Sequence, residues 1–150
     1  THHSAKLERY ALALGTLLPS MLREPRARIV PVVCTTAQSL GFSVVKMVER
    51  VQRDQLSDLH VIGNILSPAC YIDQSFPAVL YLMARYEDDF EAAVVANTNV
   101  GGDNCHRGAI LGALMGAAYG LRAIPERWIN GLTCHDEIER EIDSFVAQFA

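Results

Sequence analysis

A short polar motif at residues 101–107 has the residue types needed to bind a charged ligand. Two glycines, Gly101 and Gly102, come directly before the acidic residue Asp103. A glycine turn that leads into a helix exposes backbone N–H groups at the positive end of the helix dipole, where phosphate binds well. Asp103 can cap this helix, which is the commoner role for an aspartate at this spacing. It can also bind a divalent cation that bridges to a phosphate or ribose oxygen.

Further polar side chains follow Asp103 in the first turn of the expected helix. Cys105 could be a nucleophile, because helix N-termini stabilise thiolates, but neighbours on a helix point apart and no papain-like context surrounds it. His106 could contact phosphate, although packing is its simpler role, and Arg107 could pair with phosphate, although a surface salt bridge is commoner. The predicted substrate-binding residues are Gly101, Gly102, Asn104 and Arg107.

Glycine recurs every fourth residue in the helix that this motif begins, at Gly108, Gly112, Gly116 and Gly120. A glycine inside a helix costs about 1 kcal/mol relative to alanine, so a regular series of them needs a physical reason. A stripe without side chains lets another backbone or a ligand lie directly against the helix. We therefore expect a central, buried helix with a groove along its glycine face.

The elements that position this motif are predicted to be helices, because apolar residues recur at helical spacing through most of the chain. A connector is expected at 26–36, where Pro31 would break a strand ladder, and a turn-rich stretch at 59–68. Thr133 is expected to cap the last helix, with Ile138, Ile142, Phe145 and Phe149 on its buried face, and Trp128 to anchor the core. The predicted helices cover residues 4–23, 38–53, 72–86, 87–96 and 105–120, a short segment around Trp128, and the C-terminal residues. The predicted fold class is all-α, an orthogonal multi-helix bundle.

Composition narrows the possible partners. The chain has 150 residues, half of them apolar, which suits one domain with a real core, and its net charge is −4. It has no basic stripe, which argues against nucleic acid and against an anionic membrane surface. The four cysteines form no C-x-x-C pair, so a reducing compartment is expected, and no apolar run is long enough to span a bilayer. We expect a cytoplasmic protein.

Residues 92–110, AAVVANTNVGGDNCHRGAI, resemble the late signature of the ADP-ribosylglycohydrolase family. The continuation through 112–120 and 123–128 fits the family pattern, and the opening Thr1-His2 with its leucine-rich helix resembles the family's middle segment. The similarity spans most of the chain and is strongest from Asp89 to Leu132. It implies an all-α domain that hydrolyses N- or O-glycosidic bonds to ADP-ribose, with a pair of magnesium ions that activate water and orient the ribose.

The metal-binding residues implied by the resemblance are Asp103, Cys105 and His106. The family's late motif is Gly-Gly-Asp-x-Asp-Thr, so Cys105 replaces the second acid and His106 the hydroxyl residue. Thiolate and imidazole are softer ligands than carboxylate and suit magnesium poorly. We therefore expect at least one metal site to be weakened, lost or adapted to another ion.

The family's N-terminal motifs, Gly-Asp-x-x-Gly and Asp-Asp-Thr, do not occur in this sequence. The pair Asp88-Asp89 lies before Phe90 at an expected helix start, where acids act as caps. Residues 1–150 are therefore predicted to be one C-terminal portion of a family domain about twice as long. Two functions stay open: a hydrolase that needs the N-terminal half for activity, or a degenerate member that binds a nucleotide or serves as a structural subunit. The expected partners are an ADP-ribose-type ligand and either the protein's own N-terminal segment or a second copy.

Overall fold

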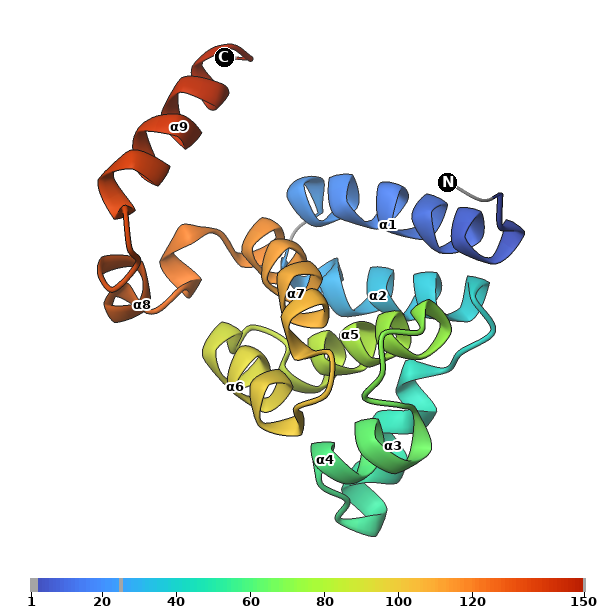
Figure 1. The fold of residues 1–150 in the computed structure, drawn as a ribbon. Coiled ribbons are helices and arrows are strands. Elements are labelled where there is room, and N and C mark those ends of the chain that lie inside the picture. The colour runs from blue at the N-terminus through green and yellow to red at the C-terminus, as the bar shows by residue number, and fades with distance from the viewer. Residues whose placement is uncertain (1–2, 25, 150) are drawn as a thin grey trace.

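The computed structural model describes residues 3–24 and 26–149, and within these residues the chain is helical without strands (Figure 1). The predicted all-α fold class is confirmed. The helices are α1 (Ala5–Arg23), α2 (Ile29–Ser39), α3 (Val44–Asp54), α4 (Asp58–His60), α5 (Ile72–Tyr86), α6 (Phe90–Val100), α7 (Asn104–Tyr119), α8 (Glu126–Asn130) and α9 (His135–Ala147). Two 3₁₀ turns, η1 (Arg26–Arg28) and η3 (Leu121–Ala123), and a π-helical turn, η2 (Val61–Ile65), complete the path.

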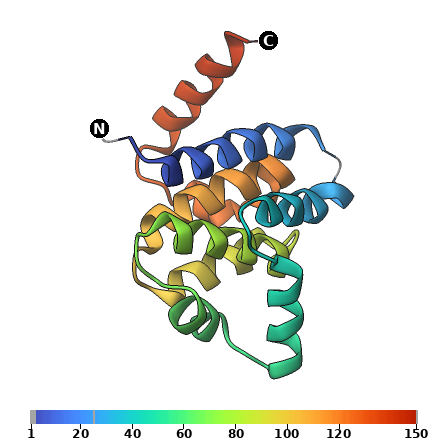
Figure 2. The same cartoon turned by 90° about the vertical axis from the view of Figure 1, so that its right-hand side faces the viewer.

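Two helices, α5 and α7, form the centre of the molecule. Every residue of α5 from Phe76 to Ala84 is buried, and the helix contacts α1, α2, α3, α6 and α7. Helix α7 contacts α1, α5 and α6, and Figure 2 shows it between α1 and the lower helices. The expectation that the glycine-rich helix is central is therefore met.

The expected connector at 26–36 was wrong, because α2 begins at Ile29. Pro31 is the third residue of α2, within the first turn, where a backbone N–H has no intrahelical acceptor. A proline that breaks a strand therefore costs this helix nothing. Ile29 and Val33 are fully buried, which explains the apolar run.

The single helix expected at 38–53 is interrupted. Helix α2 ends at Ser39, Gly41 has a φ of +83°, and α3 begins at Val44 after Ser43, whose hydroxyl accepts the Lys46 N–H. The stretch at 59–68 contains α4 and the π-helical turn η2 rather than turns alone.

Near the polar motif, α5 and α7 have the predicted bounds to within one residue, whereas α6 begins at Phe90 rather than at Glu87. The predicted helix at 72–86 matches α5, and Asp89 caps α6 by accepting the Ala92 N–H at 2.9 Å. Helix α6 extends four residues beyond the expected end at Ala96, so it reaches the glycine turn itself.

Helix α9 projects away from the other helices (Figure 1). Its four expected core residues, Ile138, Ile142, Phe145 and Phe149, are all exposed, so the prediction of a buried face was wrong for this chain. Thr133 does not cap the helix either. The N-cap position is taken by Cys134, which has a φ of +61° and makes no side-chain capping bond.

Within the described residues, no single helix is long and apolar enough to cross a membrane. Helices α2 and α3 meet that length and composition only when taken together, and they are bent by 108° relative to each other.

Candidate functional site

The polar motif forms a tight turn between α6 and α7. Gly101 and Gly102 both have positive φ values, +71° and +64°, which glycine adopts without strain. A Cβ atom on Gly102 would lie 2.3 Å from the carbonyl oxygen of Pro68, and the Asp103 N–H donates to the same oxygen at 2.8 Å. The η2–α5 loop therefore holds this turn from one side, and Gly102 is required there by space as well as by conformation.

Two buried polar side chains hold the turn from the other side. Asn97 and Arg107 are 2% and 1% exposed, respectively. The Arg107 Nε donates to Asn97 Oδ1 at 2.6 Å, and its Nη2 donates to the Gly101 carbonyl at 2.9 Å. Burial lowers the pKa of Arg107, and the negative charge of Asp103 opposes that shift. The end of α6 and the start of α7 are thereby joined by one guanidinium.

Asp103 occupies the N-cap position of α7, but its side chain makes no capping bond. Its Oδ1 instead lies 2.6 Å from Nδ1 of His106, one helical turn later. The Asp103 side chain is 22% exposed and that of His106 is 86% exposed, so the pair lies at the protein surface. Sequence spacing could have identified this contact, because residues i and i+3 share a helix face.

A family model described as ADP-ribosylglycohydrolase matches residues 1–150. The chain belongs to the ADP-ribosylglycohydrolase family. A curated relative, ADP-ribosyl-[dinitrogen reductase] glycohydrolase of Rhodospirillum rubrum, is 33% identical over 95 residues, which are 62% of this chain and 32% of the relative. The match thus spans about a third of the relative's length. No solved structure matches the chain significantly.

The three metal ligands implied by the family do not form a magnesium site together. Among the described residues, no three His, Cys, Asp or Glu side chains lie close enough to hold one ion. The Sγ of Cys105 turns toward Asn104 Oδ1 at 3.6 Å, while His106 takes the Asp103 carboxylate. Magnesium prefers six oxygen ligands in octahedral geometry, and this set supplies one carboxylate with one thiol and one imidazole. The donor set does not fit the ion.

The predicted substrate-binding residues divide into two groups. Gly101, Gly102 and Asn104 lie at the open end of α7, and the Asn104 amide also donates to the Thr98 carbonyl at 3.2 Å. Arg107 lies inside the protein, so its expected surface salt bridge is not formed and its guanidinium binds backbone and amide oxygens instead. In this structure Arg107 supports the turn from within rather than facing a ligand.

The glycine stripe of α7 is open in this chain. A Cβ atom on Gly112 or Gly116 would have no neighbour within 4 Å, whereas one on Gly108 would lie 2.9 Å from Asn97 Nδ2. A cavity of about 500 Å³ borders Gly108 and Gly112, and its walls come from α6, α8 and α9. The expected close approach is therefore seen only at Gly108, where the partner is a side chain.

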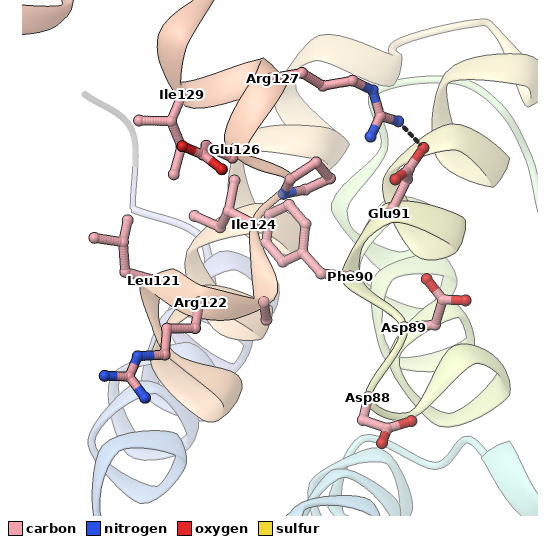
Figure 3. Close-up of a pocket in the computed structure, with 12 residues that line it drawn as sticks. Asp88, Asp89, Phe90, Glu91, Leu121, Arg122, Ile124, Glu126, Arg127 and Ile129 are labelled. Carbon is pink, nitrogen blue, oxygen red and sulfur yellow. Dashed lines mark hydrogen bonds and ion pairs between the residues drawn. The ribbon is translucent and has the colours of Figure 1, made fainter.

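A second, larger cavity lies between the start of α6 and the η3–α8 segment and has a volume of about 810 Å³. Figure 3 shows Asp88, Asp89 and Glu91 along one wall and Arg122 across from them. Glu91 is paired with Arg127 of α8. No residue of the turn at 101–107 lines this cavity, so it is not the site predicted from the glycine turn.

Sequence reasoning missed a carboxylate–tyrosine cluster that joins α4 to α5. The hydroxyl of Tyr81 donates to Asp58 Oδ1 at 2.6 Å, and that of Tyr86 donates to Asp58 Oδ2. Arg85 Nε lies 3.3 Å from the same carboxylate. Burial, followed by the bond to Asp58, raises the pKa of Tyr86 to about 12 and raises that of Tyr81 still further. The cluster could not be predicted from local sequence spacing, because Asp58 is more than twenty residues from its tyrosine partners.

Proposed function

We propose that this chain carries the Gly-Gly-Asp part of the active site of an ADP-ribosylglycohydrolase, and that the full-length protein cleaves a glycosidic bond to ADP-ribose or a related nucleoside. The observation that supports this most is the Asp103 carboxylate, which the glycine turn places at the surface, at the N-terminal end of α7. Membership of the family supports the reaction class.

Each part of the turn contributes a defined property to such a site. The first N–H groups of α7 have no acceptor within the helix and lie at the positive end of its dipole, which favours a phosphate group nearby. The carboxylate of Asp103 accepts hydrogen bonds from ribose hydroxyls and stabilises positive charge on an oxocarbenium-like sugar. A buried scaffold beneath the turn keeps these groups in place during the reaction.

Magnesium, which the family resemblance implies, needs more than these residues provide. His106 would have to release the Asp103 carboxylate, and further oxygen ligands would have to come from outside the described residues. We therefore assign no step of the reaction to a metal ion. The proposed chemistry depends on the Asp103 carboxylate and on the N-terminal end of α7.

The proposal is tested by measuring ADP-ribose release from N- and O-linked ADP-ribosylated peptides by the full-length protein, with and without divalent cations. We expect release by the wild type, and a loss on the order of a hundredfold in Asp103→Asn, which removes a group that stabilises developing charge. Glu49→Gln is the control for loss of a surface carboxylate, because Glu49 is exposed on α3, away from both the turn and α9. The proposal fails if the wild type releases no ADP-ribose under any of these conditions.

A second function, a non-catalytic member that binds a nucleotide or serves as a subunit, is favoured by one observation. Cys105 and His106 replace the expected metal ligands, and His106 occupies the carboxylate that a metal would use. Calorimetry with ADP-ribose separates the two functions. A wild type that binds ADP-ribose without hydrolysing it, together with a Cys105→Asp variant that gains hydrolysis in magnesium, would establish the second function.

A partner for the exposed apolar surface is part of the proposal. Helix α9 and the outer face of α1 both expose large apolar side chains, including Leu7, Leu22, Ile142 and Phe145. We propose that these faces are covered by an N-terminal segment of the full-length protein or by a second copy of the chain, since contiguous apolar patches mark interaction sites.

A further inference from the structure

Arg107 is unusual because it is a buried cation without an acidic partner in contact. It is 1% exposed, and its hydrogen-bond acceptors are neutral oxygens of Asn97 and Gly101. Burying a charge costs free energy unless the surroundings compensate it. The carbonyl groups at the C-terminal end of α6, which carry the negative end of the helix dipole, compensate part of this cost, and the negative charge of Asp103 compensates another part. The Nη1 atom of Arg107 is buried without a hydrogen-bond partner among the described residues.

The same guanidinium reaches across the turn that carries Asp103. Its Nη2 binds the carbonyl oxygens of Asn97 and Gly101, at 3.3 and 2.9 Å, on the α6 side, while its own backbone belongs to the first turns of α7. Asn97 completes the link, because its Nδ2 donates to the Asn104 carbonyl at 3.0 Å. The two ends of the turn therefore cannot move independently.

Gly108 is fitted to this arrangement. A Cβ atom there would lie 2.9 Å from Asn97 Nδ2, closer than side chains normally approach. A side chain at Gly108 would push Asn97 away from both Arg107 and Asn104. The glycine at this position thus keeps Asn97 in its hydrogen bonds, and it also borders the cavity beside α9.

We propose that Arg107 is a positioning residue, which together with Asn97 fixes the direction of the Asp103 carboxylate by holding the last carbonyls of α6 against the first turn of α7. This rests on the proposed function in one respect, namely that Asp103 acts on the ligand. Lysine cannot replace the guanidinium, because one ammonium group does not present a planar set of donors to three acceptors.

The first test compares Arg107→Lys with Arg85→Lys by backbone amide hydrogen exchange of the full-length protein. Arg85 is the matched control, since it is an inward arginine that pairs with Asp58 on α4 rather than with the turn. Within 101–104, the amides of Gly101 and Asp103 donate hydrogen bonds, to the carbonyls of Thr98 and Pro68. We expect these two amides to exchange at least about tenfold faster in Arg107→Lys, with α5 unchanged, and to keep wild-type rates in Arg85→Lys. Equal rates at 101–104 in both variants would overturn the proposal.

The second test applies if Arg107→Lys does not fold. Gly108→Ala keeps every charge but displaces Asn97, whereas Gly112→Ala places the same methyl group where nothing lies within 4 Å. We expect faster exchange at 101–104 only in Gly108→Ala. Unchanged exchange in Gly108→Ala would contradict the positioning role.

The kinetic constants distinguish a positioning role from a purely structural one, because only a positioning role should lower kcat while leaving KM nearly unchanged. In an active wild type, Arg107→Lys and Gly108→Ala should lower kcat for ADP-ribose release about tenfold or more while changing KM by less than about threefold, because the reacting group is misdirected but the ligand still binds. A wild type without activity would refute the proposed function, and the exchange rates would still decide the role of Arg107.

Discussion

At the residue scale, Asp103 shows which parts of the site the sequence can predict. Its place at the start of α7 follows from the two glycines before it, which form the expected turn and both have positive φ values in the structure. Its partner was not predicted, because Asp at an N-cap usually bonds to backbone N–H groups, whereas this carboxylate bonds to His106. Arg107 was expected at the surface because its burial depends on α6, and a helix contact is not encoded locally.

The Asp58 cluster predicts a specific loss of stability. Tyr81→Phe removes a 2.6 Å hydrogen bond to a carboxylate from a side chain that is 0% exposed. We expect the free energy of unfolding to fall by about 1–3 kcal/mol, measured by urea denaturation with circular dichroism. Tyr71→Phe, at a tyrosine that is 67% exposed, should change it by less than about 0.5 kcal/mol. Equal effects of the two variants would show that the cluster does not stabilise the fold.

Tyr86 predicts a stability change in alkaline solution. Its pKa is raised to about 12 in the folded protein, mainly by burial and then by its bond to Asp58, and is about 10 in an unfolded chain. The folded state therefore holds this proton more tightly. Its contribution is fully present below pH 10 and is lost as the pH rises through 12. In Tyr86→Phe, the free energy of unfolding should fall less steeply between about pH 10 and 12, and an unchanged slope would contradict the assignment.

At the element scale, a helix was predicted correctly where its apolar spacing ends at residues that also terminate a helix. The bounds of α5 match because an apolar helical pattern fills residues 72–86 and acidic residues follow it. Helix α2 was missed because Val-Pro-Val resembles strand residues, and the favourable position of Pro31 becomes visible only once the helix start is known. The break at Gly41 was missed because the apolar pattern continues across it.

The glycine turn gives a prediction that separates backbone strain at a positive φ from a steric clash between a new Cβ atom and its neighbours. Gly102→Ala introduces a side chain at a positive φ and within 2.3 Å of the Pro68 oxygen, while Gly41→Ala introduces one at a positive φ with nothing within 4 Å. We expect Gly41→Ala to cost about 1 kcal/mol from strain alone, and Gly102→Ala to cost at least about 2–3 kcal/mol. Thermal denaturation followed by circular dichroism measures both. A Gly102→Ala variant no less stable than Gly41→Ala would show that the loop at Pro68 yields.

At the scale of the whole molecule, α9 is a helix with an apolar face, as predicted, but that face is not buried against the rest of the protein. Helical periodicity predicted the helix, but whether an apolar face is buried depends on what lies against it, and the described residues leave this face exposed. The same holds for the open glycine stripe at Gly112 and Gly116. Both features lie beside one cavity, which Ile138 and Ile142 of α9 and Gly112 of α7 line together.

The exposed face of α9 yields a prediction about association. Replacing Ile142 and Phe145, which are 56% and 63% exposed, with lysine should leave the free energy of unfolding of this chain within about 1 kcal/mol of the wild type. Leu114→Ala, at a fully buried residue of α7, should cost about 2–5 kcal/mol. In sedimentation velocity, the wild type should associate and the double lysine variant should not. A monomeric wild type would mean that no second copy covers α9.

The single tryptophan stands where these surfaces meet. Trp128 of α8 packs edge-on against Phe90 of α6, with ring centroids 6.3 Å apart, and lines the cavity shared by α7 and α9. Trp128 is only partly buried in this chain. A segment that binds in that cavity will exclude water from the indole, and the tryptophan fluorescence of the protein should then shift to shorter wavelength. The protein thus has a built-in optical probe at the surface where a partner is expected.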